Sequence, residues 1–123
     1  MSATALNVQA NDFGDQRGPF LSARRVADQL GVNLGELAKL VGLARNTLAA
    51  KTAARKVDAA LSPIVRILAM AGEMAGDQQR AAIWFKHQPI PGWAGKTAYD
   101  LVGEGKPDKV LAYLEAVRSG VYA

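Results

Sequence analysis

The chain has 123 residues, half of them hydrophobic, with a formal net charge of +4 and a mean hydropathy of +0.00. This length is enough for one compact domain or two small ones. The absence of cysteine excludes disulfides and cysteine-based zinc sites, so we expect a cytoplasmic protein with no metal and no cofactor. No leader and no run of about 18 apolar residues is found, so neither secretion nor a membrane span is expected.

The positive charge is concentrated in one segment. Residues 34–66 contain six basic and two acidic side chains, whereas the charges of residues 1–33 and of residues 67–123 cancel. The six basic residues are Lys39, Arg45, Lys51, Arg55, Lys56 and Arg66. This distribution is typical of a protein in which one module faces a polyanion and the other does not.

The N-terminal half predicts an arm followed by short helices. Residues 1–19 have no hydrophobic period and are expected to form a mobile arm. Helices are predicted over residues 23–30 and 34–41, because each segment follows a capping residue and precedes a glycine. The caps are Ser22 and Asn33, the latter in a capping box with Glu36, and the glycines are Gly31 and Gly42.

A third helix is predicted from residue 44 to about residue 54. Ser62-Pro63 predicts the start of the next helix, since serine caps helices and proline is tolerated at the first helical position. This helix would carry a broad apolar stripe, which we expect to form the seam of a homodimer. The stripe consists of Ile64, Val65, Ile67, Leu68, Ala71 and Met74.

The C-terminal third predicts three more helices. Asp77 can cap a helix over residues 78–86, and Thr97 with Asp100 can cap another that ends near residue 102. Pro107 opens a last helix, which Gly120 ends, and the sequence Pro89-Ile90-Pro91-Gly92 forbids helix and predicts a stiff turn. No window alternates convincingly between polar and apolar residues, so we expect an all-α fold with no sheet.

Residues 34–53 have the spacing of a helix-turn-helix. The small Ala38 allows two helices to approach, Gly42 supplies the turn, and Leu37 and Leu48 would be buried between them. On the second helix we expect base-edge contacts from the N-terminal end and phosphate contacts farther on. The candidate DNA-binding residues are Arg45, Asn46, Thr47, Lys51, Arg55 and Lys56.

The last third of the chain is rich in aromatic residues, which suit either an interface or an ordinary core. They are Trp84, Phe85, Trp93, Tyr99, Tyr113 and Tyr122. Tyr122 favours the interface interpretation, because a residue beside the free carboxylate is seldom part of a core.

Two other features suggest an enzyme, one a phosphate-binding loop and the other a serine–histidine catalytic site, but neither matches the required pattern. The run from Gly92 to Thr97 imitates the end of a phosphate-binding loop, yet Ile90 stands where that loop needs glycine. His87 is the single histidine, and Ser22, Ser62 and Ser119 lack the context of a nucleophile. We therefore expect a surface or capping histidine.

The chain resembles the Xre/MbcA/ParS type of antitoxin, in which an Xre-like helix-turn-helix precedes a C-terminal toxin-binding domain. The likeness is close over residues 66–123 and looser over residues 20–55. The residues that carry it are Trp84-Phe85, Pro91-Gly92-Trp93-Ala94-Gly95-Lys96-Thr97, Ala98-Tyr99-Asp100-Leu101-Val102 and Arg118-Ser119-Gly120-Val121-Tyr122-Ala123. We accordingly divide the chain into a flexible arm (1–19), an Xre-like helix-turn-helix domain (20–61) and a helical toxin-binding and dimerisation domain (62–123).

The resemblance implies a type II antitoxin that is not an enzyme. Its partner would be a toxin with the RES fold, which consumes NAD by degrading it or by transferring its ADP-ribose. It also implies that the antitoxin packs on the toxin and that its chain end enters the NAD cleft. The residues given these roles are Trp93, Gly95, Lys96 and Thr97 at the interface, and Val121, Tyr122 and Ala123 in the cleft. Operator DNA and a second copy of the chain are the other expected partners.

Two alternatives belong to different functional classes. The chain could be a dimeric helix-turn-helix transcriptional repressor without a toxin partner, in which case residues 121–123 would be dispensable. It could also be a small enzyme, in which case the purified chain would be active and His87 would be essential.

Overall fold

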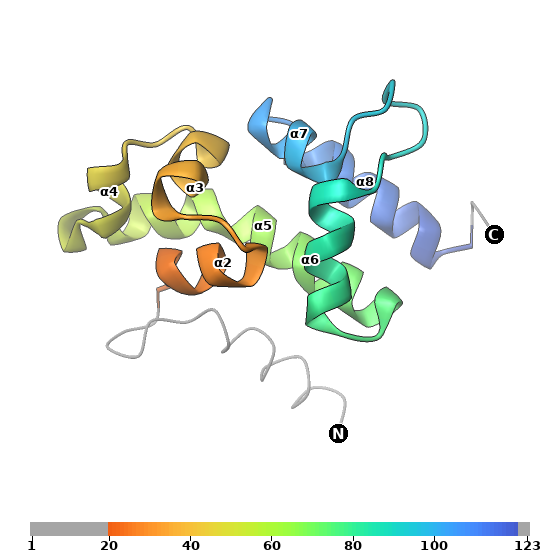
Figure 1. Cartoon of the computed structure of the whole chain (residues 1–123), viewed down its shortest axis with the longest axis horizontal. Coiled ribbons are helices and arrows are strands. Elements are labelled where there is room, and N and C mark those ends of the chain that lie inside the picture. The colour runs from red at the N-terminus through yellow and green to blue at the C-terminus, as the bar shows by residue number, and fades with distance from the viewer. Residues whose placement is uncertain (1–19, 121–123) are drawn as a thin grey trace.

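The computed structural model of the chain describes residues 20–120, and every regular element in this range is a helix (Figure 1). The helices are α2 (Ala23–Leu30), α3 (Leu34–Val41), α4 (Arg45–Ala49), the 3-10 helix η1 (Lys51–Ala53), α5 (Ala54–Ala75), α6 (Gln78–His87), α7 (Ala98–Gly103) and α8 (Pro107–Arg118). One isolated antiparallel bridge joins Pro89 to Thr97. The predicted all-α fold is confirmed for these residues, whereas the arm at 1–19 and the tail at 121–123 lie outside them.

The long helix α5 organises the molecule. Helices α2, α3 and α4 lie toward its N-terminal end, and α6, α7 and α8 lie toward its C-terminal end (Figure 1). Helices α6 and α8 make the most extensive contacts with α5, while α2 packs against α6 and α3 packs against α7. The helix-turn-helix half and the C-terminal half are therefore packed against each other as well as joined by α5.

The apolar residues of all these helices form one hydrophobic core. Leu61, Ile64, Ile67 and Leu68 of α5 have no solvent exposure, and they share the core with residues from α2, α3, α4, α6, α7 and α8. Five members of the predicted dimer seam, namely Ile64, Val65, Ile67, Leu68 and Ala71, are buried in this core. The prediction that this stripe pairs two chains is wrong, because the chain's own helices already cover it.

Helix ends follow the predicted caps closely. The Ser22 hydroxyl accepts a hydrogen bond from the Arg25 backbone N–H at 3.3 Å, and Asn33 and Glu36 form the reciprocal capping box. Gly31 and Gly42 both end their helices at φ +71°, a left-handed conformation that glycine adopts without steric strain. These local signals fix α2 and α3.

The predicted break near Ser62-Pro63 is wrong. Helix α5 already begins at Ala54, so Pro63 lies inside it and the predicted boundary between residues 61 and 62 falls within one helix. The helix continues because Val57 and Leu61 extend its buried stripe by two turns. Proline leaves the Ala59 carbonyl without its N–H donor, but Ala59 is exposed to water.

The predicted third helix is also shorter than expected. Helix α4 ends at Ala49, and Ala50 is extended at ψ 122° before the 3-10 turn of η1 begins. Leu48 is the one residue of α4 that is buried. Tertiary packing therefore contributes little to keeping this segment helical as far as residue 54. Arg45 and Lys51, which were predicted on one helix, therefore lie on α4 and η1, and Arg55 and Lys56 lie on α5.

Within residues 20–120, no single helix is long and apolar enough to cross a membrane. The segments 51–75 and 78–87 meet that criterion only when counted together, and they are bent by 114° relative to each other.

Helix α6 offers a test of the core. Phe85 has no exposed surface and meets Tyr99 edge to face, whereas Ile83 on the same helix is 56% exposed. We expect F85A to lower the free energy of unfolding by about 3–5 kcal/mol, because it leaves a cavity, and I83A to change it by less than about 0.5 kcal/mol. Urea unfolding followed by circular dichroism measures both. Similar losses for the two variants would contradict this assignment of the core.

Candidate functional site

The turn between α3 and α4 has the expected helix-turn-helix geometry. Leu37, Ala38 and Leu48 are all at most 7% exposed and bring the two helices together. After Gly42 the chain turns, and the Leu43 N–H donates to the Ala38 carbonyl at 3.0 Å. The start of α4 is thereby held at the surface.

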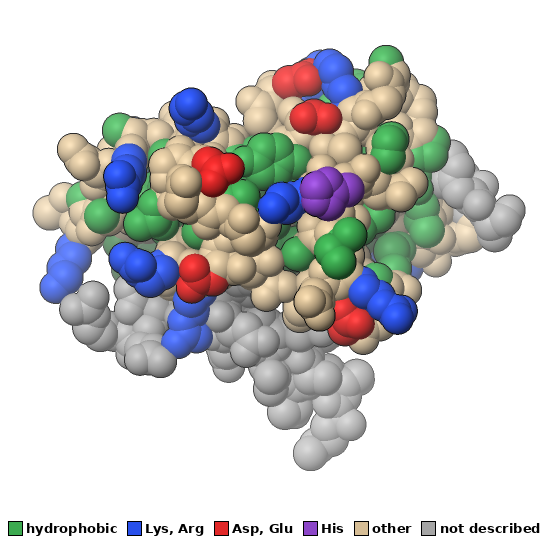
Figure 2. Space-filling model, in the orientation of Figure 1, with side chains coloured by type: hydrophobic (Ala, Val, Ile, Leu, Met, Phe, Trp, Pro, Cys, Tyr) green, Lys and Arg blue, Asp and Glu red, His purple; other side chains and the backbone are tan. Residues whose placement is uncertain are grey.

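The six candidate DNA-binding residues lie along one stretch of exposed chain. Arg45 and Asn46 begin α4, Lys51 begins η1, and Arg55 and Lys56 are in the first turn of α5, all of them exposed. Thr47 is partly buried. Figure 2 shows Lys and Arg side chains spread over the part of the visible face that carries α2, α3 and α4.

The four basic candidates form no ion pair with an acidic residue in the described part of the chain. The ion pairs that join two described residues all lie between residues 77 and 118, in the C-terminal half. Arg45, Lys51, Arg55 and Lys56 are therefore available to an external anion. Uncompensated basic side chains at the exposed end of a helix-turn-helix are the usual means of holding nucleic acid phosphates.

Arg24 is a candidate contact that the sequence did not reveal. A surface pocket of about 230 Å³ lies between the starts of α2, α3 and α4, and its lining includes Arg24, Asn33 and Arg45, with Asp28 also present. The charges of residues 1–33 cancel when they are summed along the chain, so the charge count did not identify Arg24 as a DNA-binding candidate. Folding places its side chain beside the same pocket as that of Arg45.

The loop that follows α6 is anchored at its base. Ile90 is 1% exposed, and its N–H donates to the Lys96 carbonyl at 2.8 Å. Inside this closure, the Lys96 N–H donates to the Trp93 carbonyl at 3.0 Å, and the Trp93 N–H donates to the Ile90 carbonyl at 3.3 Å. The predicted turn is confirmed, since residues 88–97 contain no helix. The connection between α6 and α7 stands away from the helical body (Figure 1).

The tip of this loop has an unusual backbone. Gly92, Ala94 and Gly95 all have positive φ, at +88°, +53° and +84°. Ala94 is the one residue other than glycine with positive φ within residues 20–120. An L-residue in this conformation carries strain of the kind that is found most often at functional sites.

The four predicted loop residues differ in their availability. Gly95 is exposed, Trp93 and Lys96 are partly buried, and the Thr97 hydroxyl is already engaged. Thr97 and Asp100 form a capping box: the Thr97 hydroxyl accepts from the Asp100 N–H, and the Asp100 carboxylate accepts from the Thr97 N–H at 3.0 Å. Thr97 thus positions the loop by starting α7.

A charged cluster that the sequence did not reveal lies beside the loop. Lys96 Nζ is 2.8 Å from Oε2 and 2.9 Å from Oε1 of the Glu104 carboxylate, and Lys106 Nζ is 3.5 Å from Oε1. Lys106 Nζ also lies 5.7 Å from the centroid of the Trp93 ring. The pKa of Glu104 is lowered, first by the hydrogen bond from Lys96 and then by the positive charges of both lysines.

The aromatic residues divide between core and surface. Phe85 is buried and contacts Tyr99 with ring centroids 6.0 Å apart and an interplanar angle of 82°. Trp84, Trp93, Tyr99 and Tyr113 are partly buried against the core. Partial burial raises the pKa of Tyr99, and the negative charge of Glu36 raises it further. Tyr122, like Val121 and Ala123, lies outside the described residues.

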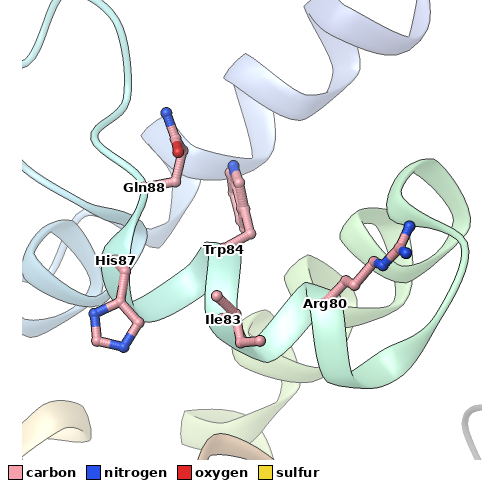
Figure 3. A pocket seen from close by; sticks show the side chains of 5 residues that line it. All are labelled: Arg80, Ile83, Trp84, His87 and Gln88. Atoms are coloured by element: carbon pink, nitrogen blue, oxygen red, sulfur yellow. The ribbon is translucent and has the colours of Figure 1, made fainter.

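His87 lies at the end of an exposed face of α6. A pocket of about 250 Å³ is lined by Arg80, Ile83, Trp84, His87 and Gln88, and Figure 3 shows His87 projecting away from Trp84 and Gln88. The serines are elsewhere: Ser22 caps α2, and the hydroxyls of Ser62 and Ser119 donate to backbone carbonyls one helical turn earlier. The prediction of a surface histidine is confirmed.

Among residues 20–120, no group of three or more His, Asp or Glu side chains is placed to hold a metal ion.

Comparison with known families matches two models to successive parts of the chain. Residues 15–65 match the antitoxin Xre-like helix-turn-helix domain, and residues 70–120 match the antitoxin Xre/MbcA/ParS C-terminal toxin-binding domain. No curated protein and no solved structure matches the chain. The first matched segment ends and the second begins within α5, and the second contains the whole loop at residues 88–97.

The strain at Ala94 can be tested directly. Glycine removes the steric penalty at φ +53° but gains entropy in the unfolded chain, so we expect A94G to raise the free energy of unfolding by about 0.5–1 kcal/mol. A112G is the control, because Ala112 is an exposed residue inside α8 and glycine there should destabilise by roughly 1 kcal/mol. Chemical denaturation of both variants gives the signs, and destabilisation by A94G would contradict the described loop conformation.

Proposed function

Because the chain belongs to the Xre/MbcA/ParS antitoxin family, we propose that it neutralises a RES-fold, NAD-consuming toxin of a type II toxin-antitoxin system. The C-terminal domain binds the toxin, and residues 121–123 occupy its NAD site. The helix-turn-helix binds operator DNA and represses the operon. The chain acts by obstruction and by DNA binding, and it performs no catalysis of its own.

The observation that carries this proposal is the match of residues 70–120 to the toxin-binding domain. Two features of that segment support it. The loop at residues 88–97 presents Trp93 and Lys96 from a rigid base, and such half-exposed aromatic residues supply much of the energy of protein interfaces. Helix α8 ends at Arg118, so the last residues follow directly from the helical body.

The physical chemistry of the chain end suits a nucleotide pocket. The phenol ring of Tyr122 can stack where an aromatic ring of NAD would lie, and the terminal carboxylate can meet a basic group that otherwise holds phosphate. Gly120 has a positive φ of +82° and turns the chain away from the axis of α8. A tail that follows such a turn can enter a cavity while the helices stay on its rim.

DNA binding is supported by the charge distribution. The exposed side chains of Arg45, Lys51, Arg55 and Lys56 have no acidic partner among the described residues, and Arg24 lines the same pocket as Arg45. Because helix-turn-helix proteins read paired half-sites, we infer that the chain binds its operator as a homodimer. The pairing uses a surface other than the α5 stripe, which is buried.

The alternative of a repressor without a toxin partner uses the same DNA-binding half. It assigns no role to residues 121–123 or to the strained loop at Ala94. Deletion of the last residues separates the two readings.

We expect a chain that ends at Gly120 to fail to protect cells from the toxin. It would lose the residues that fill the NAD site while keeping every helix of the described fold. The measurement is growth after co-induction with the product of the neighbouring reading frame. The truncated chain should show an unchanged thermal midpoint and unchanged operator affinity, whereas full protection by it would contradict obstruction of the NAD site.

Binding to the promoter of its own operon should depend steeply on salt. If about four to six phosphates are neutralised, the logarithm of the association constant should fall with the logarithm of salt concentration at a slope of about −4 to −5. We expect K56Q to reduce that slope by about one and to weaken binding to specific and random DNA alike. Fluorescence anisotropy across a salt series measures the slope.

Lys109 supplies the control for this experiment. It is also exposed, but it lies on α8 beside Asp108, with 4.0 Å between Nζ and the carboxylate. K109Q should therefore leave the slope unchanged. Equal effects of the two variants would contradict a DNA surface at the start of α5.

A further inference from the structure

The loop that carries Trp93 and Lys96 is held by two kinds of contact. Its base is fixed by the buried Ile90 and by the backbone hydrogen bond from Ile90 to Lys96. These backbone bonds fix the path of the chain but not the side-chain rotamers. Trp93 packs partly against the core, and its exposed part and the Lys96 ammonium lie outside that contact. The orientation of the two interface side chains depends on other residues.

Glu104 lies at the centre of those other contacts. Lys96 Nζ lies against both carboxylate oxygens of Glu104, 2.8 Å from Oε2 and 2.9 Å from Oε1, and Lys106 Nζ shares Oε1 at 3.5 Å. The Lys106 ammonium in turn lies 5.7 Å from the centre of the Trp93 indole, within the range of a cation–π interaction. One carboxylate thereby reaches both interface side chains, the lysine directly and the tryptophan through Lys106.

Stability does not account for this arrangement. The three charged side chains are 36–45% exposed, and exposed ion pairs contribute little to folding because water and salt screen them. Two lysines also lose rotamer freedom when they are held in one geometry. What the cluster does achieve is preorganisation: it removes alternative positions of Lys96 and Trp93 before a partner arrives, which lowers the entropy lost on binding.

We propose that Glu104 is a positioning residue of the toxin-binding surface, which fixes Lys96 directly and Trp93 through Lys106. This inference rests on the proposed function. The cluster of Lys96, Glu104 and Lys106 carries one net positive charge beside an indole. The matching part of the toxin surface is an apolar hollow bordered by a carboxylate.

The test compares E104Q with wild type in the full-length chain. Glutamine keeps the size of the side chain and removes its charge. We expect the affinity for the co-expressed toxin, measured by isothermal titration calorimetry, to fall about tenfold. The thermal midpoint of the free antitoxin should stay within about 2 °C of wild type.

Two further variants test the route through Lys106. In E115Q the exposed pair of Glu115 with Arg118, at 3.1 Å, is removed on the far part of α8, and we expect no change in affinity. K106M removes the cation beside Trp93, and the double variant with E104Q should lose less affinity than the product of the two single losses. The indole N–H resonance of Trp93 in the free protein should shift in both E104Q and K106M.

The possible failures are distinguishable. If wild type binds the toxin and E104Q binds it within twofold, the positioning role is overturned while the proposed function stands. If E104Q loses affinity together with a large drop in thermal midpoint, Glu104 is a stability residue and the inference is again overturned. If wild type itself does not bind the toxin, the proposed function fails, and this inference fails with it.

Discussion

Burial of the apolar stripe of α5 is the interaction on which the rest of the structure depends. Leu61, Ile64, Ile67 and Leu68 are completely enclosed, and helices from both matched domains enclose them. Hydrogen bonds also connect the two halves: the Gln29 side chain of α2 donates to the Gln78 carbonyl of α6 at 2.8 Å, and Lys86 of α6 donates to the Gly31 carbonyl at 3.5 Å. The helix-turn-helix half and the toxin-binding domain therefore form one packed body.

The two surfaces use charge in opposite ways. Around α4 and η1 the basic side chains have no acidic partner among residues 20–120, which suits a partner that presents many phosphates. Around the loop at 88–97 the lysines are paired with Glu104, which suits a folded partner of fixed shape. The net charge of +4 falls in residues 34–66, whereas the cluster of Lys96, Glu104 and Lys106 carries one net positive charge.

The sequence predicted those features that short-range contacts determine. Asn33 with Glu36 and Thr97 with Asp100 are three residues apart, so their capping boxes and the helices that follow could be read directly. The start of α5 could not be predicted in this way, because the burial of Val57 and Leu61 by other helices outweighs the local signal of Ser62-Pro63. The roles of Arg24, Glu104 and Lys106 were missed because they depend on contacts that form only when the chain folds.

The common core links the removal of the two activities when the protein is degraded in the cell. Small domains that share one core unfold cooperatively, so both surfaces are lost together when the chain unfolds. Under the proposed function, a protease that captures the unfolded form would release the toxin and free the promoter in the same event. Growth arrest and renewed transcription of the operon would then begin together, without any signal passing between the two ends of the molecule.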